Sequence, residues 1–210
     1  TQDGQHHLIG AEETAAAETP DIPQRPTRAF DDEVLKKEID SATRALAIGL
    51  PIIIEGEPAT GKVELARKIH NEAFGDVTLT VIDCRLLTAE NFETYLFGDD
   101  GMIGFFDPAA GQSSKGKLPL ARGGSVLFRN AHTLDRTIQS RIADVITFED
   151  ECRQESTISA ITGWFFVGPS SWMEDPDFDI APDFANTVDG KTVVAPPLSQ
   201  RSDFPKLACA

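Results

Sequence analysis

Cysteines and long apolar runs are both scarce in this chain. Its 210 residues include three cysteines, Cys84, Cys152 and Cys209, which form neither a CxxC pair nor a His/Cys cluster with zinc-ligand spacing. An odd number of scattered thiols predicts a reducing compartment rather than a disulfide framework. No apolar run approaches the ~18 residues of a membrane-spanning helix, and no signal-peptide pattern opens the chain. We therefore expect a cytoplasmic protein without membrane association.

Positive charge is also in short supply. There are 19 Lys and Arg residues against 34 Asp and Glu residues, which gives a formal net charge of -15. Such a surface repels polyanions, so we expect no direct nucleic acid binding by this segment. A protein partner with basic patches remains compatible with this charge. A hydrophobic content of 40% with thirteen Phe residues is ordinary for the core of one mid-sized domain.

The first 29 residues differ in composition from the rest of the chain. Residues 1–29 are rich in alanine, acidic residues and proline and contain few large apolar residues, which predicts a flexible acidic linker or tail. His6 and His7 lie in this polar segment, and we interpret them as solvated side chains rather than metal ligands. The chain begins with Thr1 rather than Met, as a fragment of a longer protein would.

From Phe30 onward, helical and strand patterns alternate. Apolar residues at helical spacing predict helices, and short β-branched runs predict strands that are covered on both faces. Helices are expected at 31–48, 62–73, 86–98 and 133–147, and strands at 52–54, 77–83, 125–128, 157–167 and 193–194. Residues 99–117 and 168–191 are rich in turn-forming residues and predict loops. This alternation indicates a three-layer α/β/α domain with a mainly parallel sheet of about five strands.

A phosphate-binding loop is the strongest local motif. In IIIEGEPATGKV, at residues 52–63, the pattern GxxxxGK lies between an apolar strand and an amphipathic helix. Glycines allow a tight loop that points backbone N–H groups at an anion, and the following helix adds partial positive charge. The predicted ligand-binding residues are Gly56, Glu57, Pro58, Ala59, Thr60, Gly61, Lys62 and Val63. The alternative is a glycine-rich turn whose shape only supports the packing of strand and helix.

The residues expected to hold a magnesium ion are missing. Val63 follows the loop lysine and has no hydroxyl group to bind Mg²⁺. The second strand of such a site, in GGSVLFRNAH at residues 123–132, ends in Arg129 and Asn130 where two acids are expected. At ~4 Å and an effective dielectric constant of about 20, a guanidinium repels a unit cation by roughly 4 kcal/mol. Either Mg²⁺ is excluded, or the Arg129 side chain points away.

Six stretches of the sequence occur in one characteristic order: EGEPATGKVELARKIH, VIDCRLL, YLFG, GKLPLARGGSVLF, IQSRIADVI and APPLSQRSD. In order and spacing they resemble the AAA+ domain of bacterial enhancer-binding proteins, the ATPases that remodel RNA polymerase carrying sigma-54. The resemblance covers about residues 30–207. It implies a P-loop NTPase fold, ATP or ADP as ligand, assembly into a ring, and the polymerase or its sigma factor as partner.

The chain departs from this family where the family performs catalysis. The Walker B pair, Asp-Glu in the family, aligns with Arg129 and Asn130, so a metal ligand and a catalytic base are absent. The two arginines that the family supplies to a neighbouring subunit fall near Ala181 and Thr187. The sensor residue, Asn in the family, falls near Ser170. These replacements predict that nucleotide hydrolysis has been lost.

Other family features are retained or degenerate. The sigma-contacting GAFTGA loop is not recognisable in LFGDDGMIGFFDPAAGQSS, although Arg201 matches the second arginine of the family's LRER motif. Cys84 and His70 match family positions that we interpret as packing residues. The chain stops soon after PPLSQRSDFPKL, where the family's helical lid begins, so we expect this lid to be absent or truncated.

Three functional hypotheses follow. The first is a regulatory domain that binds ATP or ADP without hydrolysis, a pseudo-ATPase that acts in transcription through protein contacts. The second keeps ATP hydrolysis with acids recruited from elsewhere, for which Asp83, Asp99, Asp100 and Asp135 are candidates, although each is more simply a solvated or capping residue. The third is a scaffold that binds no nucleotide and modulates an AAA+ homologue.

Overall fold

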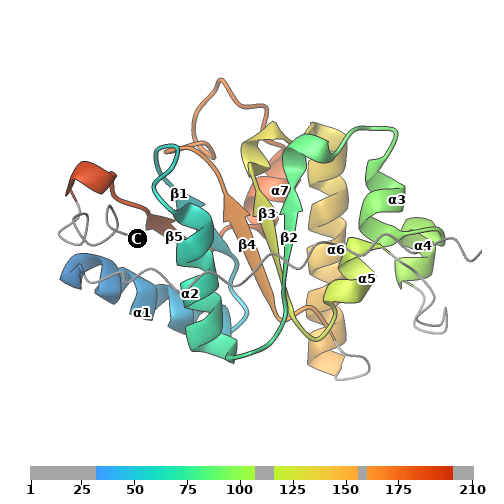
Figure 1. Ribbon diagram of the computed structural model, residues 1–210. Coiled ribbons are helices and arrows are strands. Elements are labelled where there is room, and N and C mark those ends of the chain that lie inside the picture. The colour runs from blue at the N-terminus through green and yellow to red at the C-terminus, as the bar shows by residue number, and fades with distance from the viewer. Residues whose placement is uncertain (1–31, 107–115, 156–159, 201–210) are drawn as a thin grey trace, which may run out of the picture.

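Five strands pair side by side in the order β2-β3-β4-β1-β5, and every pairing is parallel (Figure 1). The computed structural model describes residues 32–106, 116–155 and 160–200, so the predicted tail at 1–29 lies outside the described residues. The strands are β1 Ile52–Glu55, β2 Leu79–Asp83, β3 Ser125–Arg129, β4 Gly163–Val167 and β5 Lys191–Val194. The predicted parallel sheet of five strands is therefore confirmed.

Helices cover both faces of the sheet, as Figure 1 shows. One face carries α1 Glu33–Ala47 and α2 Lys62–Phe74. The other carries α3 Phe92–Phe97, α4 Gly101–Phe106, α5 Lys117–Ala121, α6 Arg136–Glu155 and α7 Pro182–Thr187. Short 3-10 turns follow two strands, η1 at Cys84–Leu86 and η2 at Ala131–Thr133, and a third lies at Leu198–Gln200. No described helix is long and apolar enough to cross a membrane.

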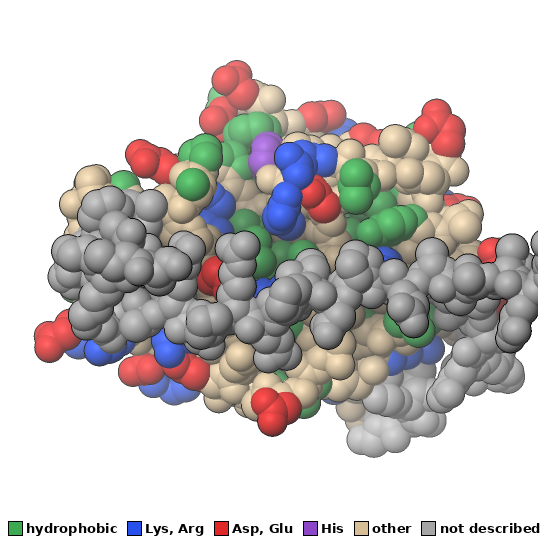
Figure 2. All heavy atoms as spheres, in the orientation of Figure 1, with side chains coloured by type: hydrophobic (Ala, Val, Ile, Leu, Met, Phe, Trp, Pro, Cys, Tyr) green, Lys and Arg blue, Asp and Glu red, His purple; other side chains and the backbone are tan. Residues whose placement is uncertain are grey.

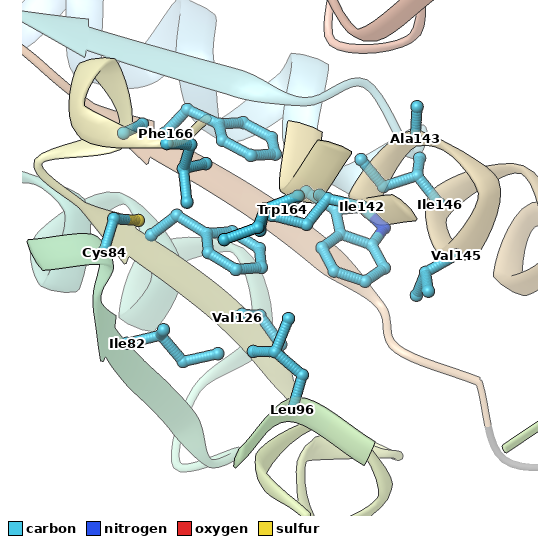
Figure 3. Packing of buried hydrophobic residues seen from close by; sticks show 14 of the residues in the cluster. Ile82, Cys84, Leu96, Val126, Ile142, Ala143, Val145, Ile146, Trp164 and Phe166 are labelled. Carbon is cyan, nitrogen blue, oxygen red and sulfur yellow. The ribbon is translucent and has the colours of Figure 1, made fainter. Parts of the chain in front are cut away.

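Strand alternation explains the two cores. Successive side chains of a strand point to opposite faces, so Ile52 and Ile54 join the core under α1 and α2, while Ile53 joins the other. In that second core, the ring of Phe128 stacks on Trp164 and Phe166, at centroid distances of 6.4 and 5.3 Å. Figure 3 shows these β4 side chains among residues of β2, β3, α3 and α6.

The helix predicted at 86–98 is shorter than expected. Only Phe92–Phe97 is helical, and Gly98 ends it with a φ of 84°. The Asn91 side chain accepts a hydrogen bond from Thr88 N at 2.8 Å and donates one to Leu86 O at 2.9 Å. These side-chain hydrogen bonds satisfy backbone groups that a helix starting at residue 86 would otherwise pair, so the helix begins later.

Two of the predicted loops contain helices. The segment predicted as a loop at 99–117 contains α4, whose Phe105 is buried and packs edge-on against Phe97 at 5.6 Å. The turn-rich segment at 168–191 contains α7, where Pro182 occupies the first turn and Phe184 is fully buried. Proline is favoured at a helix start because its missing N–H has no intrahelical partner there. Aromatic burial thus stabilises short helices that periodicity alone did not reveal.

The remaining boundary differences have local causes. The helix predicted at 133–147 runs from Arg136 to Glu155. Its start is displaced because Asp135 Oδ1 accepts a hydrogen bond from Ile138 N at 3.0 Å, as a capping side chain does. The strand predicted at 157–167 begins only at Gly163, and residues 156–159 lie outside the described part.

His70 packs as the sequence analysis expects. The ring is buried, lies edge-on to Phe74 and Phe165, and its Nε2 is 2.7 Å from Val77 O. Burial lowers the pKa of His70, an effect that the Val77 hydrogen bond partly offsets. The folded state therefore holds the neutral ring more strongly than the unfolded state does.

We expect a pH-dependent stability from this ring. Its folded-state pKa lies below the unfolded value of 6.5, so stability is complete above about pH 6.5 and declines as the pH falls through the window below. Denaturant titrations between pH 7.5 and 5.5 would measure this decline, and His70→Gln should reduce its slope. Equal slopes for the two proteins would contradict this assignment.

Candidate functional site

The predicted phosphate loop connects the end of β1 to the start of α2. Gly56 and Gly61, which bracket the loop, have φ values of 148° and 84°. A Cβ atom on Gly56 would lie 2.6 Å from Ala195 O, so the chain leaving β5 requires glycine here. The sequence therefore places its glycines where the backbone needs them.

The interior of the loop is tightly closed. The buried Thr60 hydroxyl donates a hydrogen bond to Glu57 O at 2.9 Å. Ala59 has a φ of 64°, a left-handed conformation that a residue with a Cβ atom adopts at a cost of roughly 1–2 kcal/mol. Pro58 is exposed between these residues.

Lys62 folds back over the loop. Its Nζ donates hydrogen bonds to Gly56 O at 2.7 Å and Glu57 O at 2.6 Å, and burial lowers its pKa. The N-cap residue Gly61 provides no side-chain hydrogen bond to the first turn of α2, where Val63 contributes only an apolar side chain. An ammonium group next to an uncapped helix N-terminus is an arrangement suited to anions.

A buried carboxylate at the end of β1 was not predicted. Glu55 ends an otherwise apolar strand, and its Oε2 accepts a hydrogen bond from Ser171 N at 3.0 Å. Burial raises the pKa of Glu55, and the nearby charge of Glu174 adds to this effect. The bond fixes the turn after β4 beside the phosphate loop, while the predicted sensor position, Ser170, is exposed. The sequence feature that could have identified this residue is the single acid at the end of an otherwise apolar strand.

The ends of β2 and β3 form a cationic cluster around Asp83. Arg129 Nη2 lies 3.0 Å from Asp83 Oδ2, and Asn130 Nδ2 donates to Asp83 Oδ1 at 2.9 Å. Arg85 Nη2 and Nε also donate to this carboxylate, at 2.6 and 3.0 Å. Hydrogen bonds from Arg85 and Asn130, with the charge of Arg129, hold the pKa of Asp83 well below its usual range. Figure 2 shows cationic, acidic and histidine side chains gathered above the ends of these strands.

Of the two alternatives for Arg129, the structure shows the second. The guanidinium turns towards β2 and pairs with Asp83. Asn130 occupies a left-handed conformation with a φ of 60°, which asparagine tolerates well, and its amide is likewise committed to Asp83. The carboxylate next to both residues is that of Asp83, at the end of β2.

The four acids considered as replacements for the missing Walker B pair either have other partners or lie far from the phosphate loop. Asp83 is bound by two guanidinium groups, and Asp135 caps α6. Asp99 and Asp100 line a cavity of about 610 Å³ with Arg141, on the α3–α4 side of the molecule and away from α2 in Figure 1. Among the residues that the structure describes, no group of three or more His, Cys, Asp or Glu side chains could hold a metal ion.

The other positions from the sequence alignment have structural roles. Ala181 is the buried N-cap residue of α7, and Thr187 donates from its hydroxyl to Asp183 O at 2.8 Å. Cys84 is buried, which raises the pKa of its thiol, so it is inert as the packing interpretation expects. Arg201 lies outside the described residues.

Comparisons with known proteins agree with this fold. A family model described as the Sigma-54 interaction domain matches residues 29–154. The transcriptional regulatory protein TyrR of Haemophilus influenzae is 27% identical over 132 residues, and the nitric oxide reductase transcription regulator NorR of Escherichia fergusonii is 32% identical over 117. These matches cover 60% and 55% of this chain but only 38% and 22% of the relatives.

Solved structures show the same architecture. Crystal structures of NtrX from Brucella abortus in complex with ATP and with ADP superpose with TM-scores of 0.61 and 0.63. Each match covers 87% of this chain and 42% or 41% of NtrX, at sequence identities of 17% and 16%. At such low identity the likeness concerns the fold, which is that of a P-loop NTPase of the AAA+ class.

Proposed function

This chain belongs to the Sigma-54 interaction domain family of transcriptional regulators, and we propose that it is a regulatory domain that binds ATP or ADP without hydrolysing it. The closed loop at Gly56–Val63 supplies the phosphate site, and its effect is exerted through protein contacts. The observation that carries this proposal is the position of Lys62 over a loop that leads into the uncapped N-terminus of α2.

Two further findings support nucleotide as the ligand. NtrX, which shares the fold, was crystallised with ATP and with ADP. In the present chain, Lys62 is held by two loop carbonyl groups rather than by a carboxylate, so its positive charge is uncompensated by these contacts. A phosphate group would neutralise that charge and accept hydrogen bonds from it.

The end of β3 supports binding without turnover. Phosphoryl transfer to water needs a residue that orients the attacking water and a cation that neutralises developing charge. Asn130 has no basic group, and both Asn130 and Arg129 are bound to Asp83. Because the pKa of Asp83 is strongly lowered, its carboxylate is also a weak base.

Protein partners are proposed on the basis of the family. RNA polymerase with its sigma factor, or an AAA+ homologue in a mixed ring, are the two partners that this relationship suggests. The net charge of -15 favours contacts with a basic protein surface over contacts of this segment with nucleic acid. We place this activity in the cytoplasm, where transcription regulators meet the polymerase.

Calorimetric titration with ATP and ADP, paired with a phosphate-release assay, tests the proposal. We expect saturable binding with both nucleotides and no phosphate release above a protein-free blank. Absence of binding at high protein concentration would favour the scaffold hypothesis, which is tested by mixing the chain with an active AAA+ homologue and following its ATPase rate. Release of phosphate that Lys62→Ala abolishes would establish the hydrolase alternative.

A further inference from the structure

The cluster at the ends of β2 and β3 contains two guanidinium groups and one carboxylate. Asp83 is the shared acceptor, and the guanidinium groups of Arg85 and Arg129 both contact it, so the three side chains carry a net charge of +1. Arg85 alone binds both carboxylate oxygens of Asp83, and the Asn130 amide adds a further hydrogen bond. Arg129 is therefore the member that can leave while Asp83 stays satisfied.

Arg129 also lies within reach of the phosphate loop. In the sheet, Arg129 pairs with Val167 of β4, and Val167 pairs with Ile54 of β1. At ~4.8 Å for each strand spacing, the backbone of Arg129 lies roughly 10 Å from that of Ile54, two residues before the loop. An extended arginine and a bound phosphate group can bridge this gap together. The Arg129 side chain is 44% exposed, so it is not enclosed by the surrounding described residues.

Lys62 and the turn that follows Arg129 both lie at the edge of the sheet where its parallel strands end. His132 lies in η2 and packs edge-on against Phe178 at 5.2 Å. Burial lowers the pKa of His132, and the positive charge of Lys62 lowers it further. Arg129 ends β3, and Lys62 begins α2 just after β1, so both residues belong to the edge of the sheet formed by the carboxyl ends of the strands.

We propose that Arg129 replaces the divalent cation of this site: it leaves Asp83 and binds the terminal phosphate of a nucleoside triphosphate, which is therefore bound without Mg²⁺. This inference rests on the proposed function and concerns the same site. A guanidinium forms short, charge-assisted and often bidentate hydrogen bonds with phosphate. Its positive charge then compensates the terminal phosphate, while the same charge opposes a magnesium ion beside it. When no nucleotide is bound, Arg129 forms its ion pair with Asp83.

Titrations of the full chain with and without magnesium test this inference. Wild-type protein should bind ATP at least as tightly in excess EDTA as in excess MgCl₂. Arg129→Gln should weaken ATP binding in EDTA by about 10-fold and ADP binding by less, because the terminal phosphate loses its charged partner. Arg141→Gln, a distant exposed arginine on α6, is the matched control and should leave both affinities unchanged.

A second variant should shift the affinity in the opposite direction. Asp83→Asn removes the charge that holds Arg129 and should tighten ATP binding several-fold. Arg85→Gln should weaken ATP binding, because Arg129 is then needed to neutralise Asp83. Binding that requires Mg²⁺, or an Arg129→Gln protein with wild-type affinity, would overturn the inference while leaving nucleotide binding established. Failure of the wild-type protein to bind ATP or ADP in either buffer would instead overturn the proposed function.

Discussion

Lys62→Ala is expected to lower the affinity for ATP and ADP by about 100-fold or more, because a buried phosphate loses its closest fixed positive charge. The Nζ of Lys62 lies 2.7 Å from Gly56 O and 2.6 Å from Glu57 O, so it is already positioned over the loop before a ligand arrives. Alanine also leaves the first turn of α2 intact, since alanine has the highest helix propensity. Calorimetric titration of both proteins in one buffer measures the difference.

The matched control for this variant lies one and a half turns along the same helix. Lys68 is partly exposed on α2 and pairs with Glu72 at 2.7 Å, and Lys68→Ala should keep wild-type nucleotide affinity. Lys68→Ala should unfold within about 0.5 kcal/mol of wild type, because surface substitutions rarely exceed that change. Lys62→Ala should lose somewhat more stability, about 1 kcal/mol for each of its two hydrogen bonds to the loop. Unchanged affinity in Lys62→Ala would show that nucleotide does not bind through this lysine and would favour a packing role for the loop.

The sequence predicted those parts of the molecule that depend on local pattern. Ile52–Ile54 was expected to be a strand covered on both faces, and it lies between β4 and β5 with all three side chains buried. The loop glycines were identified because a tight turn before a helix leaves few alternatives to glycine. Helix α2 differs from its predicted range, 62–73, by a single residue at its end.

What the sequence did not reveal depends on pairings between distant strands. Asp83 and Arg129 are direct partners in the register of β2 and β3, and only the strand order brings them together. Before that order is known, Asp83 is one acid among 34 and Arg129 a substitution without a partner. The bond between Glu55 and Ser171 joins residues 116 positions apart and was missed for the same reason.

The short helices α4 and α5 illustrate a further limit. A helix of five or six residues has little stability of its own and forms only where tertiary packing supports it. Phe105 and Phe106 of α4 pack against Phe148 of α6, at ring-centroid distances of 6.1 and 4.7 Å. These contacts involve a residue beyond 147, the predicted end of this helix, which in the structure continues to Glu155.

A buried ion pair joins these short helices to α6. Glu149 is fully buried, and its two oxygens accept hydrogen bonds from Arg122 Nε at 3.1 Å and from Ile161 N at 2.7 Å. The Arg122 guanidinium also lies 4.3 Å from the ring centroid of Phe105 and donates to Phe105 O at 3.0 Å. One arginine therefore connects the chain after α5 to both α4 and α6.

Arg122→Ala is expected to destabilise the protein by about 3 kcal/mol, because it leaves the Glu149 carboxylate buried without its charged partner. Denaturant unfolding at neutral pH measures the loss. Arg141→Ala is the control: its pair with Asp144, at 3.7 Å between exposed side chains, should contribute less than about 0.5 kcal/mol.

A second substitution separates the charge effect from packing. Glu149→Gln keeps an oxygen that can accept the Ile161 N–H but carries no charge, so the double variant with Arg122→Ala should recover part of the lost stability. If the two losses simply add, Arg122 stabilises the domain through its contact with Phe105 rather than through Glu149. Nucleotide affinity should be the same in all three proteins, because this ion pair lies on the face of the sheet opposite α2 and does not contact the phosphate loop.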